Sequence, residues 1–186
     1  MSLVVKSRDG KVLVEVEGAN SLDDHDLRGA DFAGQQLEGI NISDSDLRGA
    51  DFTGADLYWA YAFMANCEGA IFRKTQLNGA NLMEANLRGA DLRDAYISFD
   101  NLGGCPQLQG ADLAGAMLDG AILIGCEYDD STVFPAGFDP ATNGMIWTDP
   151  GRVYFRPGSL ASAKLEPGYY VPDKNNPGSF TPPKKN

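Results

Sequence analysis

Residues 46–57 read DLRGADFTGADL, in which the large apolar residues Leu47, Phe52 and Leu57 stand five positions apart. Alanine stands two positions before each of the last two, aspartate one position before all three, and glycine two positions after the first two. A period of five fits neither the 3.6-residue turn of a helix nor the two-residue alternation of a strand. The pattern instead predicts a short side of chain followed by a corner, where glycine supplies a positive φ.

The large apolar residue of each repeat, here called the centre, recurs over most of the chain. Centres run from residue 22 to residue 102, slip by one position within 103–107, and resume from 108 to 128. Leu, Ile or Phe fills 19 of the 22 centres. Four such sides close a coil of 20 residues, so that one inward column carries Phe32, Phe52, Phe72 and Leu92 and the next carries Leu37, Leu57, Leu77 and Ile97. At the slip we expect one extra residue to bulge while the column continues.

The repeats ADFAG at residues 30–34 and ANLME at residues 80–84 follow the pattern Ala-(Asp or Asn)-Leu-x-Gly in all or most of its positions. This pattern resembles the pentapeptide-repeat family over residues 20–130. The resemblance implies an all-β fold, a right-handed quadrilateral parallel β-helix, and 22 repeats at four per coil make about 5.5 coils. The period and the inward face come from the residues themselves, whereas the handedness and the square section come from the resemblance.

The sequence predicts four segments. Residues 1–18 alternate apolar and polar side chains around a two-residue turn at Asp9-Gly10, which favours a β-hairpin cap over a separate interaction hairpin. Residues 19–130 form the β-helix, and residues 131–147 resemble the C-terminal cap of many family members. Residues 148–186 form a Pro/Gly-rich tail, because nine of the ten prolines lie after residue 130. A tail of this composition is expected to be flexible unless a partner orders it.

Composition excludes several classes of protein. The net charge is -11 with only 15 Lys and Arg, which predicts no direct nucleic-acid binding. No apolar run reaches the roughly 20 residues of a membrane helix, so no membrane partner is expected. Three cysteines without a CxxC motif argue against a disulfide framework and predict a reducing, cytoplasmic location.

No combination of residues indicates an enzyme, and we predict no catalytic, cofactor-binding or metal-ligating residue. The single histidine, His25, stands in an acidic run that a β-helix would splay apart, so a cation site is not favoured. Cys105 and Cys126 are expected to stack in adjacent coils if the slip inserts residues just after Cys105. Packed thiols are the favoured interpretation, and a disulfide or a metal pair is the alternative.

The predicted β-helix carries the acidity, with 19 Asp or Glu and 6 Lys or Arg in residues 19–130. A column roughly 25 Å tall matches a stretch of duplex DNA with about 15 phosphate charges. Some members of the family are DNA mimics, so the resemblance makes a regulator or protector of a type II topoisomerase (gyrase) one alternative function. A row of arginines on one acidic face weakens that alternative. The candidate acidic surface consists of Asp26, Asp31, Asp46, Asp51, Asp56 and Asp91.

A second anomaly is a cluster of aromatic and apolar residues at positions predicted to point outward. The N-terminal hairpin or the tail could cover these side chains, or they could form a surface for a protein partner or for self-association. A site that stacks carbohydrate or another ligand is a third interpretation. The candidate partner surface consists of Tyr58, Trp59, Tyr61, Phe63, Met64, Tyr96 and Phe99.

Together these features predict a non-enzymatic rigid scaffold that binds a protein partner or assembles into a larger complex. Topoisomerase regulation by DNA mimicry is the first alternative. A structural component of a bacterial or phage assembly is the second alternative.

Overall fold

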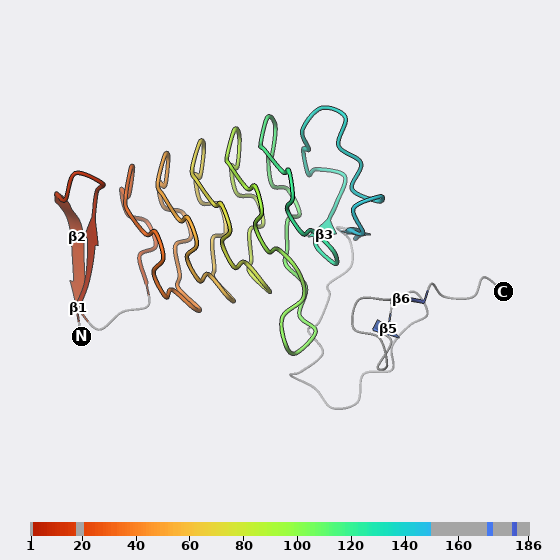
Figure 1. Ribbon diagram of the computed structural model, residues 1–186, viewed down its shortest axis with the longest axis horizontal. Coiled ribbons are helices and arrows are strands. Elements are labelled where there is room, and N and C mark those ends of the chain that lie inside the picture. Colours follow the sequence, from red (N-terminus) through yellow and green to blue (C-terminus); the bar gives the residue numbers. More distant parts are fainter. Residues whose placement is uncertain (1, 18–20, 150–170, 173–179, 182–186) are drawn as a thin grey trace. The chain divides into compact units, whose positions relative to one another are not determined.

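The computed structural model describes residues 2–17, 21–149, 171–172 and 180–181, and the chain divides into two units, 1–154 and 155–186. All the helix or strand elements of the described residues are β-strands (Figure 1). In the first unit these are β1 (Ser2–Lys6), β2 (Val12–Glu17), β3 (Glu127–Tyr128) and β4 (Ile146–Trp147). The second unit contributes an antiparallel pair, β5 (Val171–Pro172) and β6 (Phe180–Thr181). The rest of the predicted tail of 148–186, apart from residues 148–149, lies outside the described residues.

Residues 21–128 wind into stacked coils that pair with one another through parallel bridges (Figure 1). Asp31 pairs with Asp51 and Asp51 with Ile71, each 20 residues on. The N–H of a centre donates to a carbonyl of the next coil, as Phe52 does to Ile71 at 2.7 Å. The backbone N–H and C=O groups of each five-residue side therefore find hydrogen-bond partners in the coils above and below. For this reason the coils need no long strands.

The centres fill the interior of the column. Phe32, Phe52 and Phe72 are fully buried and stack face to face, with ring centroids 4.7 and 4.9 Å apart and interplanar angles of 9° and 2°. Leu92 continues this column and is also fully buried. The structure confirms the predicted inward columns, since the four centres of the neighbouring side, Leu37, Leu57, Leu77 and Ile97, are buried as well.

The aspartate or asparagine before each centre has a local structural role. Its side-chain oxygen accepts a hydrogen bond from the N–H two residues on, as at Asp51 to Thr53 (2.9 Å) and Asn81 to Met83 (3.0 Å). This bond stabilises the turn that follows each centre. Acidity is therefore a by-product of turn formation wherever aspartate occupies this position.

The slip near residue 103 is larger than predicted. Asn81 pairs with Gln107, 26 residues on, whereas the earlier rungs join residues 20 apart. Six residues are thus added to this coil, not one. Leu102, predicted to be a centre, is 74% exposed, and the column continues from Ile97 to Leu123. The residues between Ile97 and Gln107 are called the insertion loop below.

The N-terminal hairpin contacts the first coil. β1 pairs antiparallel with β2, and the Ser7 N–H donates to the Lys11 carbonyl, so the turn holds three residues and not the predicted two. Asp31 N–H donates to the Lys6 carbonyl at 2.7 Å. Val5 is buried in the same cluster as the first centres, so the hairpin adds to the core of the column.

Aromatic residues pack against the core at the other end of the column. The ring of Phe134 packs edge-on against Tyr128 (5.4 Å, 81°) and stacks on Phe138 (5.2 Å, 21°). Met145 is buried, and β4 pairs in parallel with β3. These residues lie within or next to the segment 131–147, for which the sequence predicts a cap.

Candidate functional site

Two bulky residues of the predicted partner surface occupy backbone positions that favour glycine. Trp59 has φ of 56°, where Gly39 and Gly79 stand one coil before and one coil after it. Met64 has φ of 55°, and Asp44 and Glu84 at the same corner of the neighbouring coils have φ of 58° and 57°. A non-glycine residue in this left-handed region costs about 1–2 kcal/mol. At the Trp59 corner, where the neighbouring coils carry glycine, this strain calls for a compensating contact, whereas at the Met64 corner it is shared by the neighbouring coils.

Trp59 has such a contact, because the insertion loop folds back over it. The Trp59 indole Nε1–H donates to the Asp100 carboxylate at 2.5 Å, and the Asn101 N–H donates to the Tyr58 hydroxyl at 2.5 Å. The rings of Tyr58 and Trp59 meet edge to face at 4.9 Å. At Gly79 a Cβ atom would lie 2.8 Å from the indole, so only glycine fits beneath the loop.

Asp100 also organises the insertion loop internally. Its carboxylate accepts the N–H groups of Leu102 (2.8 Å) and Gly104 (2.6 Å), and its own N–H donates to the Gly104 carbonyl at 2.9 Å. Asn78 anchors the start of the loop by donating to the Phe99 carbonyl at 3.1 Å. The loop is therefore a closed turn held on one corner of the column, with Leu102 exposed.

The structure divides the predicted partner surface into separate parts. Three of its residues are half-buried at the insertion loop: Tyr58, Trp59 and Phe99. The sequence predicts a further repeat in place of this loop. Tyr96 is 44% exposed and pairs with Gln76 and Ile122, so it lies on a different side from Tyr61. The part that stays together and open is the corner patch, defined as Tyr61 (45% exposed), Phe63 (half-buried) and Met64 (50% exposed).

Arginines pair with most of the predicted acidic surface. In three separate turns an aspartate pairs with the arginine two residues after it: Asp26–Arg28 (2.6 Å), Asp46–Arg48 (2.6 Å) and Asp91–Arg93 (2.7 Å). Arg73 lies 3.4 Å from Asp91, and Arg8 of the hairpin turn lies 3.0 Å from Asp51. The remaining two, Asp31 and Asp56, are half-buried and accept backbone N–H groups at 3.1 Å.

The same arginines set the protonation of the carboxylates. The hydrogen bond from Arg28 lowers the pKa of Asp26 to about 2. Hydrogen bonds from Arg48 and Arg93 lower the pKa of Asp46 and of Asp91 in the same way. These groups are charged at neutral pH but lie beside a matching positive charge, which weakens their field at a distance.

The cysteines are free thiols. Burial raises the pKa of Cys67 and of Cys105 to about 12. Cys126 is fully buried, and its Sγ–H donates to the Ile97 carbonyl at 2.8 Å. His25 Nδ1 lies 2.6 Å from the Asp23 carbonyl, and across residues 2–17 and 21–149 no three His, Cys, Asp or Glu side chains come together as metal ligands.

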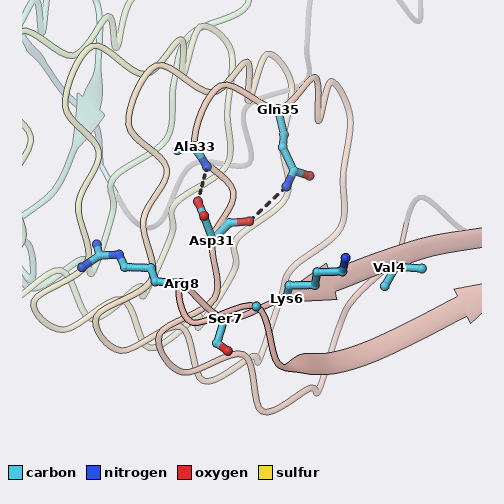
Figure 2. A pocket seen from close by; sticks show the side chains of 8 residues that line it. Val4, Lys6, Ser7, Arg8, Asp31, Ala33 and Gln35 are labelled. Atoms are coloured by element: carbon cyan, nitrogen blue, oxygen red, sulfur yellow. Dashed lines mark hydrogen bonds between the residues drawn. The ribbon is translucent and has the colours of Figure 1, made fainter.

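Sequence reasoning missed one pocket, between the hairpin and the first coil (Figure 2). It has a volume of about 270 Å³ and is lined in part by Lys6, Ser7, Arg8, Asp31 and Gln35. Figure 2 shows Asp31 accepting the Ala33 N–H and Gln35 donating to the Asp31 carbonyl. Arg8 pairs with Asp51, so most of the polar lining already has partners within the protein.

Comparison with known proteins identifies the family. A family model for pentapeptide repeats matches eight copies over residues 26–61 and 65–98. The chain belongs to the pentapeptide-repeat family. Members of this family fold as right-handed quadrilateral β-helices and are in general non-enzymatic structural repeat proteins. The described part of the chain contains no helical segment with the length and hydrophobicity of a membrane span.

Three solved structures illustrate the similarity. A pentapeptide-repeat protein from Nostoc is 31% identical, with 61% of this chain and 85% of that chain covered and a TM-score of 0.37. A pentapeptide-repeat protein from Cyanothece is 29% identical, with coverage of 52% and 65% and a TM-score of 0.33. QnrB1, a plasmid-mediated fluoroquinolone resistance protein, is 18% identical, with coverage of 69% and 80% and a TM-score of 0.28. No curated protein matches the chain.

Proposed function

We propose that this pentapeptide-repeat protein is a rigid, non-enzymatic scaffold that binds a protein partner, or a second copy of itself, through the corner patch. The observation that carries the proposal is Met64. It adopts φ of 55° and leaves half of its side chain exposed. Asp44 and Glu84, at the same corner of the neighbouring coils, share the positive φ, so the feature particular to Met64 is an exposed apolar side chain where those coils carry a charged one.

The surroundings of the corner patch support a binding role. Tyr61 adds an exposed aromatic ring three residues away, where the same side carries Asn41 one coil before and Asn81 one coil after. Exposed aromatic and methionine side chains are enriched in protein interfaces. The hydrogen bonds between coils hold the patch in a fixed geometry, so binding would require little ordering of the backbone.

We further propose that the two ends of the column are closed by the chain itself. The hairpin of β1 and β2 would cap the first coil, and residues 131–147 would cap the last, which keeps the four-segment organisation predicted from the sequence. Because Leu102 lies outside the column, the number of coils falls below the predicted value of about 5.5. Caps at both ends suit a scaffold that must stay monomeric or assemble only through defined surfaces.

DNA mimicry is the weaker candidate. A mimic of duplex DNA presents uncompensated negative charge at regular spacing, whereas four of the six predicted acidic residues pair with arginine. The 18% identity to QnrB1 gives no support to either function. A topoisomerase therefore stays an alternative partner, with a separate readout in the test below.

The test replaces the corner patch with residues found at equivalent positions of the same side. Tyr61→Asn follows Asn41, and Met64→Asp follows Asp44. The double variant should fold as stably as the parent but lose self-association in sedimentation velocity and lose the partner captured from the host. Val12→Asn removes an exposed apolar residue of the hairpin and serves as the control that should keep both.

Two results would contradict the proposal. The double variant could sediment and capture partners as the parent does, which would leave the corner patch without a role. Alternatively, it could lose more than about 1 kcal/mol of stability, which would make the patch part of the fold. Inhibition of gyrase supercoiling by the parent that disappears in Asp46→Asn, but not in the corner variant, would favour DNA mimicry.

A further inference from the structure

The corner patch lies between two acidic residues at the same corner of the column. The Asp44 N–H donates to the Phe63 carbonyl at 2.9 Å, and the Met64 N–H donates to the Met83 carbonyl at 3.0 Å. Asp44, Met64 and Glu84 therefore follow one another in successive coils, and all three side chains are exposed. Along this corner the column presents an acidic, an apolar and an acidic side chain in that order.

The two acidic residues have no cationic partner among the ion pairs of the described part of the chain. Neither Asp44 nor Glu84 takes part in any of these pairs. The arginines nearest to them in the sequence, Arg48 and Arg88, each pair with an aspartate instead, at 2.6 and 2.9 Å. The two negative charges are thus not matched within the fold, and they stay available to a partner.

The apolar area between these charges is larger than Met64 alone. Tyr61 is 45% exposed, and Phe63 is half-buried on the same side of the column. Met83 stands at the position of Phe63 in the following coil and is also half-buried, whereas Ser43 stands there in the preceding coil. An apolar centre with a polar rim is the usual anatomy of a protein interface.

The order of the charges disfavours a second copy of the chain as the occupant. A twofold axis across the column at Met64 would set Asp44 of one copy against Glu84 of the other. A twofold axis parallel to the column would set each acidic residue against its own equivalent. Both arrangements bring like charges together, whereas a partner with a cationic, an apolar and a cationic side chain avoids this cost.

The spacing along the corner indicates the conformation of such a partner. Coils stacked at the β spacing put Asp44 and Glu84 about 10 Å apart along the column. In an α-helix, residues i and i+7 lie on one face about 10.5 Å apart, with i+3 and i+4 between them. An extended segment returns to the same face only every ~6.8 Å, so it falls out of step with the coils. A helix that lies along the column would place about one turn on each coil.

We infer that the corner patch binds an amphipathic helix of a partner protein, with an apolar residue flanked one turn before and one turn after by lysine or arginine. The apolar residue would pack on Met64 and Tyr61, and the two cations would face Asp44 and Glu84. Apolar anchors at this helical spacing are a recurrent mode of peptide recognition. The inference rests on the proposed function, because it names the kind of partner that the same patch takes.

The probe is an alanine-rich helical peptide of about 18 residues, with leucine at its middle and lysine one turn before and one turn after it. A scrambled peptide of equal composition, in which the leucine and the lysines leave their common face, is the matched control. Fluorescence anisotropy with the full-length chain should show the lysine peptide binding at least tenfold more tightly than the scrambled one. Equal binding would mean that net charge alone attracts the peptide, and it would overturn the inference.

A charge-reversal variant then locates the contact. Asp44→Lys with Glu84→Lys should keep the fold, because Lys74 occupies another corner at a φ of 57°. This variant should bind the lysine peptide at least tenfold more weakly and should gain a similar factor for a peptide with glutamate in place of lysine. Asp94→Lys with Asp119→Lys makes the same change in net charge at exposed residues elsewhere on the column and should bind as the parent does. Equal losses in the two variants would contradict the inference.

The host partner separates this inference from the proposed function. If Tyr61→Asn with Met64→Asp loses that partner while the charge-reversal variant keeps it, the patch binds without its acidic flanks, and only the inference is wrong. If the parent self-associates through the patch, the occupant is a second copy and again only the inference is wrong. If both variants keep the partner, the inference and the proposed function fail together, whereas loss in both variants supports the two.

Discussion

The same substitution at two leucines distinguishes the observed column from the one that the sequence period predicts. Leu92 and Leu102 are both centres by spacing, but Leu92 is fully buried and Leu102 is 74% exposed. A buried Leu→Ala change costs about 2.7–5 kcal/mol, depending on how far the site collapses. Hydrogen bonds fix the backbone around Leu92, at Phe72 N–H to Asp91 (2.7 Å) and at its own N–H to Met117 (2.9 Å). Collapse is therefore restricted, and the upper part of this range is expected.

Leu102→Ala should change the free energy of unfolding by no more than about 0.5 kcal/mol, the usual range for surface substitutions. The assay is urea unfolding followed by far-UV circular dichroism, with the slope of the transition compared among the parent and both variants. A cost above about 2 kcal/mol for Leu102→Ala would place this residue in the column and refute the six-residue insertion. A cost below about 1 kcal/mol for Leu92→Ala would refute the packed interior.

Two further predictions follow from the polar contacts. Asp91→Asn should lower the free energy of unfolding at pH 7 by up to about 1 kcal/mol. The Arg93 hydrogen bond lowers the pKa of Asp91 from its ordinary value of 3.8. The difference in unfolding free energy between variant and parent, measured in urea, should therefore shrink as the pH falls below about 4. An unchanged difference at pH 2.5 would contradict this reading of the Asp91–Arg93 pair. Asp100→Ala removes the acceptor for Trp59 and for two loop amides, so limited proteolysis should cleave within 98–106 at least tenfold faster while the melting temperature stays within a few degrees. Equal cleavage rates would mean that Asp100 does not hold the loop.

The period predicted the column because each repeat position has one physical task. Centres such as Phe52 fill the interior, aspartates such as Asp51 bond the turn, and glycines such as Gly54 adopt the positive φ of the corner. The insertion loop escaped prediction for an arithmetic reason. Six added residues equal one whole repeat plus one, so the spacing of centres after the loop is identical to that after a one-residue bulge. Leu102 happens to fall where a centre would stand.

The candidate site was predicted only in part for the same reason. The sequence predicted that Trp59 and Met64 point outward, at positions that elsewhere carry Asp, Asn, Arg or Gly, but it offered the hairpin, the tail or another chain as covers for the aromatic side chains. The cover of Trp59 is Asp100, from a segment interpreted as a repeat. Which aspartates pair with arginine within a turn could be inferred from the Asp-x-Arg spacing, as at Asp91, whereas the contact of Arg8 with Asp51 depends on hairpin docking that spacing does not encode.

The insertion loop has a consequence for how this chain tolerates changes in length. The rungs on both sides of it are intact, since Gln76 pairs with Tyr96 before it and Asn81 with Gln107 across it. The register of the coils is therefore set by the position at which the chain returns to the column, and not by the number of residues in the loop. We therefore expect insertions at this corner to leave the later coils in register, as the six added residues do. The corner between Ile97 and Gln107 is thus a natural place to graft a new recognition loop onto a fixed frame.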